Sequence, residues 1–277
     1  MPELPEVEFC ARALRRWSRG RRVEGVVLHD PRVVRSARTD RPTAGRPDAE
    51  RALCAVVCHA PCGPVERHGK RLLWRFGDHA LLLHLGMTGK WTHHPRGASP
   101  PRFARVTLEL DDATAVVFED PRLLGGIVPT TAADGALLLR EGLGPDALGA
   151  QLPRVPGKRP IKVALLDQGV VAGIGNVQAM EALWRAHLDP RTPCEALTPA
   201  QWAALDTALQ TQLRHTLDLL GDGDTITYVE ESRASNPFAI YRREGEPCPA
   251  CGAPLARMVQ AARSTYWCPS CQTGSDG

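Results

Sequence analysis

The sequence predicts an α+β protein in which a helix and the strands of a sandwich or barrel come first, and helices with a metal-binding hairpin follow. Three observations support this. Short β-branched or Leu-rich segments separated by turn residues fill the first half of the chain. Helical spacing of apolar residues replaces them in the second half. Two Cys-x-x-Cys pairs then lie close to the C-terminus.

A helix is expected near the start of the chain, from Pro5 to about Trp17, with Gly20 as the stop signal. Apolar residues recur there at helical spacing, at Val7, Cys10, Leu14 and Trp17. The expected strands are Val23–His29, Leu53–Cys58, Arg71–Phe76, Ala80–Leu85, Ala104–Leu110 and Thr114–Glu119. Short strands at this density are typical of a sandwich or barrel. The segment Ser36–Pro47, rich in Arg, Thr, Pro and Gly, is expected to be an exposed loop.

The strand pattern stops near Gly142–Pro160, where Gly and Pro accumulate, and we place a domain boundary there. The helices expected beyond it are Ile161–Asp167, Val177–His187 and about Pro199 to Leu220. The third of these begins with Thr198-Pro-Ala-Gln201, which has the pattern of a capping box, and Gly221 ends it.

The composition, 43% hydrophobic and 23% charged, is that of a soluble globular protein. There is no apolar run long enough to span a membrane and no secretory signal pattern at the start, so we expect a cytoplasmic protein. A net charge of +3 is weak support for a nucleic-acid partner. Nearly all of the 34 basic residues are Arg, which suits phosphate recognition, but a G+C-rich genome explains the same bias equally well. Composition alone leaves the partner open.

Four of the nine cysteines predict one structural zinc site. Cys248-x-x-Cys251 and Cys268-x-x-Cys271 are separated by sixteen residues. Each pair supplies two thiolates about one tight turn apart, and two such pairs complete a closed tetrahedral site.

Three other cysteines, Cys54, Cys58 and Cys62, recur every four residues. This spacing allows a second metal site, but the strand expected over Leu53–Cys58 favours plain buried or half-buried thiols. In a cytosolic chain, cysteines in this number argue against a disulfide scaffold.

Pro2 and Glu3 have the residue types that attack on a sugar carbon requires. Met1 is normally removed before a small residue, which leaves the secondary amine of Pro2 as the N-terminus. Its reference pKa near ~8 leaves a useful neutral fraction at pH 7, and the positive end of the following helix disfavours the ammonium form. Addition to C1′ of a sugar gives an iminium that withdraws electrons, while Glu3 can donate a proton to the ring oxygen and then act as a base. Taken alone, the pair is also an ordinary start of a chain.

Asn176 and Arg263 are candidates for phosphate contact. Asn176 follows Gly173-Ile-Gly175 at the start of a helix, where its side chain can cap the helix or the exposed amides of residues 170–175 can seat an anion. Arg263 lies between the two cysteine pairs, where a zinc-held hairpin would project it. Taken alone, Arg263 is equally an ordinary surface residue.

Seven motifs, in order along nearly the whole chain, resemble the formamidopyrimidine-DNA glycosylase / endonuclease VIII family. They are Met1-Pro-Glu-Leu-Pro-Glu-Val-Glu8, Gly69-Lys70, His84-Leu-Gly-Met87, Asp120-Pro-Arg122, Gly173-Ile-Gly-Asn176, Glu246-Pro-Cys-Pro-Ala-Cys251 and Arg263-Ser-Thr-Tyr-Trp-Cys-Pro-Ser-Cys-Gln272. With Leu4 in the opening motif, the chain resembles the formamidopyrimidine branch of the family. The resemblance implies an N-terminal β-sandwich with a flanking helix over residues 1–145, a helix–two-turn–helix module over 146–237 and a zinc-finger β-hairpin over 238–277.

The resemblance also implies the catalytic roles. Pro2 would be the Schiff-base nucleophile and Glu3 the proton donor. Lys70 would serve β-elimination and phosphate contact, and Arg263 would serve δ-elimination and grip the phosphates of the lesion. The acidic residues that match supporting positions are Glu6 and Glu181.

Damaged double-stranded DNA is the partner that the resemblance implies. The residues that match positions on the DNA backbone are Asn176, Lys158 and Lys162. The family flips the target base out of the stack, which leaves a space to be filled. The residues that match the space-filling positions are Met87, Arg122 and Leu124, with Arg122 facing the orphaned base.

Four positions depart from the pattern of the family. Leu124 stands where the formamidopyrimidine branch usually has Phe, and it forgoes aromatic stacking worth about 1–3 kcal/mol per base. Gln178 replaces a frequent Tyr, and Phe103 replaces a His that commonly contacts DNA. The loop Thr225–Phe238, which covers the flipped base in the family, lacks the usual Gly-rich character. These departures leave the catalytic residues intact and put the lesion preference in question.

The expected function is therefore that of a bifunctional DNA glycosylase and abasic-site lyase in base excision repair. It would remove oxidised purines, such as 8-oxoguanine and formamidopyrimidines, through a Pro2 Schiff base with β,δ-elimination. The same chemistry on an oxidised or modified pyrimidine is the alternative, and a non-catalytic DNA clamp is a third possibility. We expect a monomer, associated with the nucleoid if the source is a bacterium.

Overall fold

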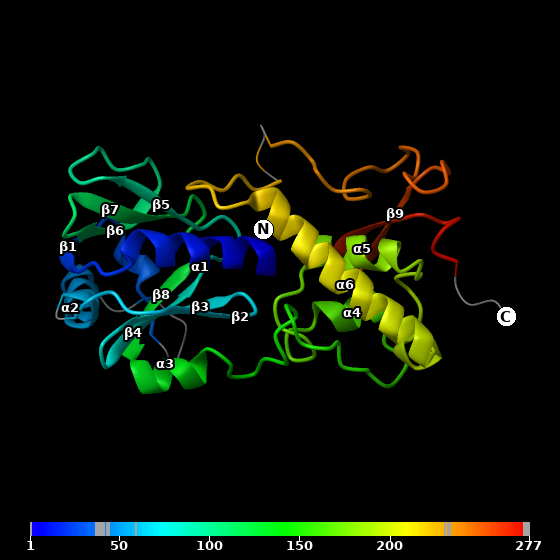
Figure 1. The fold of residues 1–277 in the computed structure, drawn as a ribbon, viewed down its shortest axis with the longest axis horizontal. Helices are drawn as coiled ribbons and strands as arrows, with labels where there is room; N and C mark the ends of the chain where they lie inside the picture. The colour runs from blue at the N-terminus through cyan, green and yellow to red at the C-terminus, as the bar shows by residue number, and fades with distance from the viewer. Residues whose placement is uncertain are drawn as a thin grey trace. The chain divides into compact units, whose positions relative to one another are not determined.

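The structure, a computed structural model, describes residues 2–36, 42, 45–58, 60–229, 231 and 234–273. The chain divides into two compact units (Figure 1). The first unit comprises Met1–Glu141 and Leu220–Tyr228, and the second comprises Gly142–Leu219 and Val229–Gly277. The short segment that follows the longest helix thus belongs to the first unit. Within the described residues, every helix is too short or too polar to cross a membrane.

The first unit is a sandwich of two antiparallel four-stranded sheets, which confirms the predicted fold. One sheet has the order β1-β6-β7-β5, and its strands are β1 (Val23–Leu28), β6 (Ala104–Leu110), β7 (Thr114–Glu119) and β5 (Lys90–Pro95). The other has the order β2-β3-β4-β8, and its strands are β2 (Val65–His68), β3 (Arg71–Phe76), β4 (His79–His84) and β8 (Gly126–Thr131). Aromatic rings join the two sheets, since Trp74 and Trp91 lie with ring centroids 5.9 Å apart. The core of the unit therefore lies between the sheets.

Helix α1 (Leu4–Ser18) flanks the sandwich, as the sequence predicts. Its apolar stripe is buried, with Val7, Leu14 and Trp17 each at most 7% exposed. The helix packs against β2. This packing fixes the start of the chain on the sandwich.

Helix α2 (Arg46–Val57) replaces the strand predicted over Leu53–Cys58. Its buried residues are Ala49, Leu53, Val56 and Val57, which share one helical face. The prediction was wrong because a short apolar run, read alone, has no periodicity that separates a strand from a buried helical face. The predicted loop Ser36–Pro47 ends two residues earlier than expected, at Gly45, and its residues 37–41, 43 and 44 lie outside the described part of the chain.

The three cysteines near this helix do not gather around a metal. Cys54 is half-buried and Cys62 is buried, as predicted, but Cys58 is exposed. Among the described residues, the His, Cys, Asp or Glu side chains that lie close enough together to hold a metal ion are the four C-terminal cysteines.

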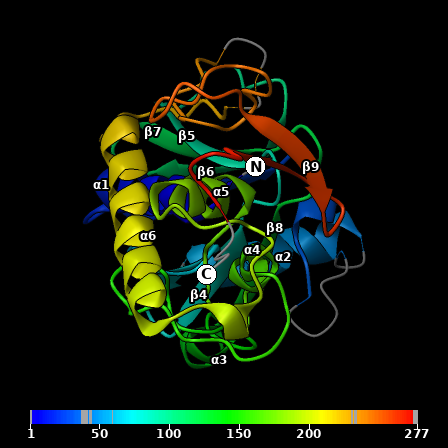
Figure 2. The same ribbon diagram turned by 90° about the vertical axis from the view of Figure 1, so that its right-hand side faces the viewer.

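The second unit contains the three predicted helices, α4 (Ile161–Leu166), α5 (Asn176–Arg185) and α6 (Pro199–Leu220, of which Leu220 lies in the first unit). The capping box of α6 is confirmed, since Thr198 N donates to Gln201 Oε1 over 2.9 Å and Gln201 N donates to Thr198 Oγ1 over 3.2 Å. A hairpin of β9 (Ala256–Gln260) and β10 (Arg263–Trp267) follows. Helix α5 lies between α6 and this hairpin (Figure 2).

Candidate functional site

The start of α1 holds a compact acidic group in the first unit. Pro2 and Glu3 are buried immediately before the helix. Glu3 N donates to Glu6 Oε2 over 2.8 Å, which satisfies an amide that the helix leaves open. Desolvation by burial and the neighbouring Glu3 carboxylate raise the pKa of Glu6 to about 7. A carboxyl that holds its proton near neutral pH therefore lies one helical turn from Pro2.

Lys70 lies in the two-residue turn between β2 and β3, in the same unit. Gly69 makes this turn possible because its φ of 55° is a left-handed conformation that favours glycine. Arg67 links the turn to α1: its Nε donates to Glu8 over 2.8 Å and its guanidinium donates to Gly69 O over 3.1 Å. Burial raises the pKa of Glu8, but the hydrogen bond and charge of Arg67 and the charge of Arg15 outweigh it, so the pKa is lowered. The helix of Pro2 and the turn of Lys70 are thus joined by a buried ion pair.

Asp120 organises the two loops that carry the predicted space-filling residues. Its carboxylate is fully buried and accepts from Thr88 Oγ1 over 2.5 Å, from Arg122 N over 3.2 Å and from Gly125 N over 2.7 Å. One carboxylate therefore fixes the loop of Arg122 and Leu124 and ties it to the residue after Met87. Sequence reasoning noted Asp120 in a motif but gave it no role.

Met87 and Leu124 are large apolar side chains that remain 38% and 39% exposed. Arg122, between them in the chain, is exposed as well. Their loops touch at Gly86, where a Cβ atom would overlap the carbonyl carbon of Leu124. The structure thus places the three predicted space-filling residues on adjoining loops, with their side chains accessible.

Asn176 is the first residue of α5 rather than its cap. The N-cap residue is Gly175, and the Asn176 side chain makes no capping hydrogen bond. Instead, Asn176 Nδ2 donates to Ser264 O over 3.0 Å, and among the described residues its buried Oδ1 accepts no hydrogen bond. The capping prediction was wrong because the N-cap position falls one residue earlier, on Gly175, so the Asn176 oxygen does not accept from the first amides of the helix.

The two lysines predicted to contact the DNA backbone differ sharply in their exposure to solvent. Lys158 is exposed. Lys162 is 0% exposed, and its Nζ donates to Thr265 Oγ1 over 2.6 Å. A direct phosphate contact suits Lys158, but it does not fit the position that Lys162 occupies here.

Arg263 is exposed at the start of β10, where it pairs with Gln260 across the hairpin. The turn between them consists of Ala261 and Ala262, with φ of 48° and 58°. Both alanines are in the left-handed region, which two-residue hairpin turns need but which Ala adopts at a cost. The hairpin projects Arg263 from a turn that is not intrinsically favourable.

The four C-terminal cysteines fit a structural zinc ion. Their Sγ atoms all lie within 4.8 Å of one another. The Cys248–Cys271 and Cys251–Cys268 sulfur pairs are 3.8 and 3.6 Å apart, close to the edge of a tetrahedron with Zn–S bonds of about 2.3 Å. The chain therefore carries one structural zinc site, as predicted.

Trp184 supports this zinc site from α5, since its Nε1 donates to Cys248 Sγ over 3.4 Å. Burial raises the pKa of Cys248, but the hydrogen bond from Trp184 and those from the amides of Ala250 and Cys251 outweigh it and lower the pKa to about 6. A thiolate stabilised in this way is suited to bind a metal.

Glu181 holds the chain that leads into the zinc finger. Its carboxylate, 1% exposed, accepts from the backbone amides of Ala239, Ile240 and Tyr241 over 2.9–3.0 Å. These hydrogen bonds lower the pKa of Glu181, but desolvation is the larger effect and raises it overall. In this unit Glu181 therefore orders the segment after the loop predicted to cover a flipped base. Residues 230, 232 and 233 of that loop lie outside the described part.

Gln178 is an interior residue. It is 0% exposed, and its Oε1 accepts from Gln212 Nε2 over 3.3 Å and from Thr216 Oγ1 over 3.2 Å. This departure from the pattern of the family thus joins α5 to α6 and does not reach a DNA-facing surface. The ring of Phe103 lies under the Arg102 guanidinium, whose carbon is 5.1 Å from the ring centroid.

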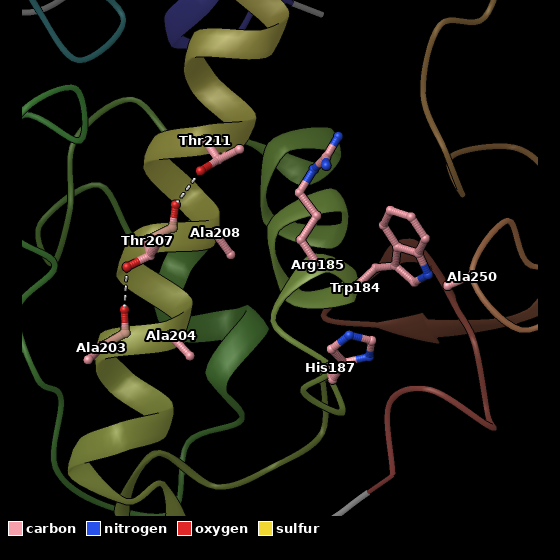
Figure 3. Close-up of a pocket in the computed structure, with 9 residues that line it drawn as sticks. All are labelled: Trp184, Arg185, His187, Ala203, Ala204, Thr207, Ala208, Thr211 and Ala250. Carbon is pink, nitrogen blue, oxygen red and sulfur yellow. Dashed lines mark hydrogen bonds between the residues drawn. The ribbon is translucent and has the colours of Figure 1, made fainter.

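A cavity of about 640 Å³ opens in the second unit between the end of α5, α6 and Ala250 (Figure 3). Trp184, Arg185 and His187 form one wall. On the other wall, Thr207 and Thr211 donate to carbonyl oxygens of their own helix, so their hydroxyl protons are already used. The residues that line it include neither Asn176 nor Arg263. The cavity is therefore separate from the predicted chemistry of this unit.

The first unit is a sandwich whose first helix follows buried Pro and Glu residues, and the second is a helical unit with a zinc hairpin. This combination defines the class of two-unit, zinc-bearing DNA glycosylases. Three family models agree with this class. They describe the formamidopyrimidine-DNA glycosylase N-terminal domain at residues 1–127, its H2TH domain at 139–228, and a zinc finger found in FPG and IleRS at 245–274. The chain belongs to the formamidopyrimidine-DNA glycosylase family.

Individual relatives extend over the full length of the chain. A formamidopyrimidine-DNA glycosylase of Roseiflexus sp. is 36% identical, over 98% of this chain and 100% of its own. The Lactococcus lactis Fpg (MutM), solved with DNA that contains an oxidised pyrimidine, is 25% identical with a TM-score of 0.84 and covers 98% of this chain and 100% of its own. A MutM solved with DNA that contains carbocyclic 8-oxo-G is also 25% identical, with a TM-score of 0.82 and the same coverage.

Proposed function

We propose that this chain is a bifunctional DNA glycosylase and abasic-site lyase that removes oxidised purines from double-stranded DNA. The observation that carries the proposal is the group of buried Pro2 and Glu3 and half-buried Glu6 at the start of α1, with the pKa of Glu6 raised to about 7. The names and bound DNA of the relatives support the substrate class, because they include formamidopyrimidine and 8-oxo-G lesions. In a bacterium the enzyme would act on the chromosome in the cytoplasm.

Pro2 would supply the nucleophile once Met1 is removed. Its nitrogen lone pair adds to C1′ of the damaged nucleotide, the bond from C1′ to the base breaks, and the base leaves with the proton that the proline nitrogen gives up. Opening of the sugar then breaks the C1′–O4′ bond, with O4′ taking a proton from Glu3, and yields an iminium between Pro2 and C1′. Because the proline nitrogen is secondary, this iminium is positively charged without a further proton.

Elimination follows from the charge of the iminium. Loss of a proton from C2′ to a base sends its electron pair toward C1′ and expels the 3′ phosphate. In a second elimination, loss of a proton from C4′ forms a C4′–C5′ double bond and expels the 5′ phosphate. We assign support of the first step to Lys70 and of the second to Arg263. Glu6 would keep Glu3 supplied with a proton, since a carboxyl with a pKa of about 7 is partly protonated at neutral pH.

The exposed loops of the first unit would occupy the space that the flipped nucleotide leaves. Met87 and Leu124 offer apolar volume, and Arg122 offers hydrogen-bond donors to the orphaned base. Lys158 and Arg263, both exposed, would contact phosphates. Glu181 would support the active site indirectly, by ordering residues 239–241.

An oxidised pyrimidine is the second candidate substrate. Leu124 supports it, because a Leu stacks less strongly than an aromatic ring and alters how the enzyme opens the duplex at the lesion. The oxidised-pyrimidine DNA bound by the Lactococcus lactis relative is consistent with it. A panel of duplexes, each with one lesion, separates the candidates. Strong cleavage at a pyrimidine lesion beside weak cleavage at 8-oxoguanine opposite cytosine would favour the second.

Borohydride trapping tests the catalytic assignment. We expect an adduct that mass spectrometry places on Pro2 in the mature protein, and no adduct when an N-terminal tag precedes Pro2. The same tag at the C-terminus is the control and should leave trapping intact. Full strand cleavage by the N-terminally tagged protein, or a crosslink at another residue, would overturn the role of Pro2.

A further inference from the structure

Three consecutive residues of β10, next to Arg263, are held by helices α4 and α5. The Ser264 carbonyl accepts from Asn176 Nδ2 over 3.0 Å. The Thr265 hydroxyl accepts from Lys162 Nζ over 2.6 Å. The amide of Tyr266 donates to the sulfur of Met180 over 3.1 Å. The strand that carries Arg263 is thus anchored residue by residue.

The contact between Lys162 and Thr265 is the most deeply buried of the three. Both residues are 0% exposed, so the ammonium group is closed off from solvent within the second unit. A buried ammonium is stable only where hydrogen-bond acceptors replace its water, and the Thr265 hydroxyl is such an acceptor. The buried ammonium group of Lys162 can hold strand β10 in place, but it cannot reach a ligand outside the protein.

The hairpin needs anchors because its own turn is unfavourable. Ala261 and Ala262 both have positive φ, a conformation that the Cβ atom opposes. An isolated two-stranded hairpin is marginally stable at best. A further contact, from Gln260 Nε2 to Pro190 O over 3.0 Å, holds the last residue of β9. Arg263 and its turn are therefore positioned by contacts on both strands.

We propose that Lys162 is a positioning residue: through Thr265 it fixes the strand that presents Arg263, and it does not itself contact DNA. The proposal rests on the proposed function only for its consequence in catalysis. The anchor itself is a property of the second unit. Lys158, four residues earlier and exposed, is the matched lysine for which direct phosphate contact is expected.

A double-mutant cycle with Arg263 tests whether Lys162 acts through Arg263. In the wild-type background, we expect Lys162→Met to lower the single-turnover cleavage rate by about 100-fold, as a displacement of about 1 Å can do. In an Arg263→Ala background, the same substitution should change the rate by less than about twofold, because its effect passes through Arg263. An undiminished further loss in that background would overturn the proposal.

The salt dependence of DNA binding separates the two lysines. In the Arg263→Ala background, Lys158→Met should reduce the slope of log K against log salt by about 1, the value of one phosphate contact. Lys162→Met should leave that slope unchanged. A reduction by about 1 with Lys162→Met would show that Lys162 contacts a phosphate, and the proposal would fail.

Amide hydrogen exchange on the zinc-loaded full chain tests, independently of activity, whether the contact of Lys162 with Thr265 holds strand β10. Lys162→Met, and Thr265→Val as a variant of similar shape, should each accelerate exchange at the amides of residues 264–266 relative to wild type. Unchanged protection in both variants would overturn the proposal even if the protein cleaves DNA. If wild type fails to cleave any lesion but both variants lose protection, the proposed function fails and the anchor stands. Thr265→Val also serves if Lys162→Met does not fold.

Discussion

The two ends of the chain present the residues that we propose for catalysis by opposite means. At the N-terminus, Pro2 and Glu3 are buried against a helix that begins two residues after Pro2, and their hydrogen-bonded partner, Glu6, is a neighbour in sequence. At the other end, Arg263 is exposed on a strained hairpin and depends on residues far away in sequence, such as Lys162, 103 positions from Thr265.

This difference fits the chemistry that we propose for each end. An amine and a carboxyl that exchange protons need desolvation, which a helix start packed on a sandwich supplies locally. A guanidinium that grips phosphates needs exposure, so its position must be fixed from behind, by a metal and by buried anchors. The stability of the first region should therefore depend on pH, and the order of the second region should depend on the metal and on the buried anchors.

Removal of the zinc should give the largest effect and break only the second region. Structural zinc in small fingers contributes about 10–16 kcal/mol of apparent binding free energy, most of it used for folding. We expect Cys248→Ser, or a strong chelator, to expose residues 245–273 to proteolysis and to weaken DNA binding. Borohydride trapping at an abasic site present in excess should persist, because Pro2 lies in the other unit.

Cys58→Ser is the matched control, since Cys58 is exposed and outside the cluster of four cysteines. It should leave proteolysis and DNA binding as in wild type. Unchanged protease resistance after complete removal of the metal would contradict the dependence of the hairpin on zinc.

The N-terminal region should instead show a pH effect, through Glu6. Its folded pKa is about 7 against a usual value of 4.5, so the folded state binds the proton more tightly than the unfolded state. The free energy of unfolding therefore falls as pH rises from about 4.5 through 7. We expect Glu6→Gln to remove this fall and to raise the free energy of unfolding at pH 8 by about 2 kcal/mol, allowing for a half-buried side chain. Urea unfolding between pH 5 and 8 measures it.

Glu8→Gln provides a control of opposite sign on the same helix. The pKa of Glu8 is lowered, so its contribution to stability is present above the unfolded pKa and is lost as pH falls. Glu8→Gln should destabilise the first unit at pH 8. Parallel pH profiles for wild type and Glu6→Gln would refute the assigned pKa of Glu6.

The sequence predicted the strands in the middle of each sheet better than those at the edges. The three strands that were not predicted, β2, β5 and β8, each form the edge of a sheet. An edge strand has neighbours on one side only and buries fewer residues. In β2 only Val65 is buried, so the sequence lacks the apolar pattern that reveals a strand.

For the candidate sites, local motifs were predictable and distant pairings were not. The cysteine spacing sufficed for the zinc site, whereas the opening Met1–Glu8 predicted an N-terminal site only together with the other motifs of the family, and the roles of Pro2 and Glu3 stay predictions. The contacts of Asp120 with Thr88 and of Lys162 with Thr265 join residues 32 and 103 positions apart. No periodicity encodes such contacts: Lys162 was predicted to contact DNA from the family resemblance, and Asp120 received no role.

The smallest expected effect concerns the strained turn of the hairpin. Ala262 has a φ of 58°, and Gly adopts this conformation without the penalty of about 1 kcal/mol that a Cβ atom brings. The greater freedom of Gly in the unfolded chain offsets part of the gain. We therefore expect Ala262→Gly to stabilise the hairpin by less than about 1 kcal/mol, seen as slower chelator-driven zinc loss. Ala256→Gly, in strand β9 and without a positive φ, should accelerate zinc loss. If both substitutions shift zinc loss in the same direction, the turn is not strained, and the need for anchors behind Arg263 must come from elsewhere.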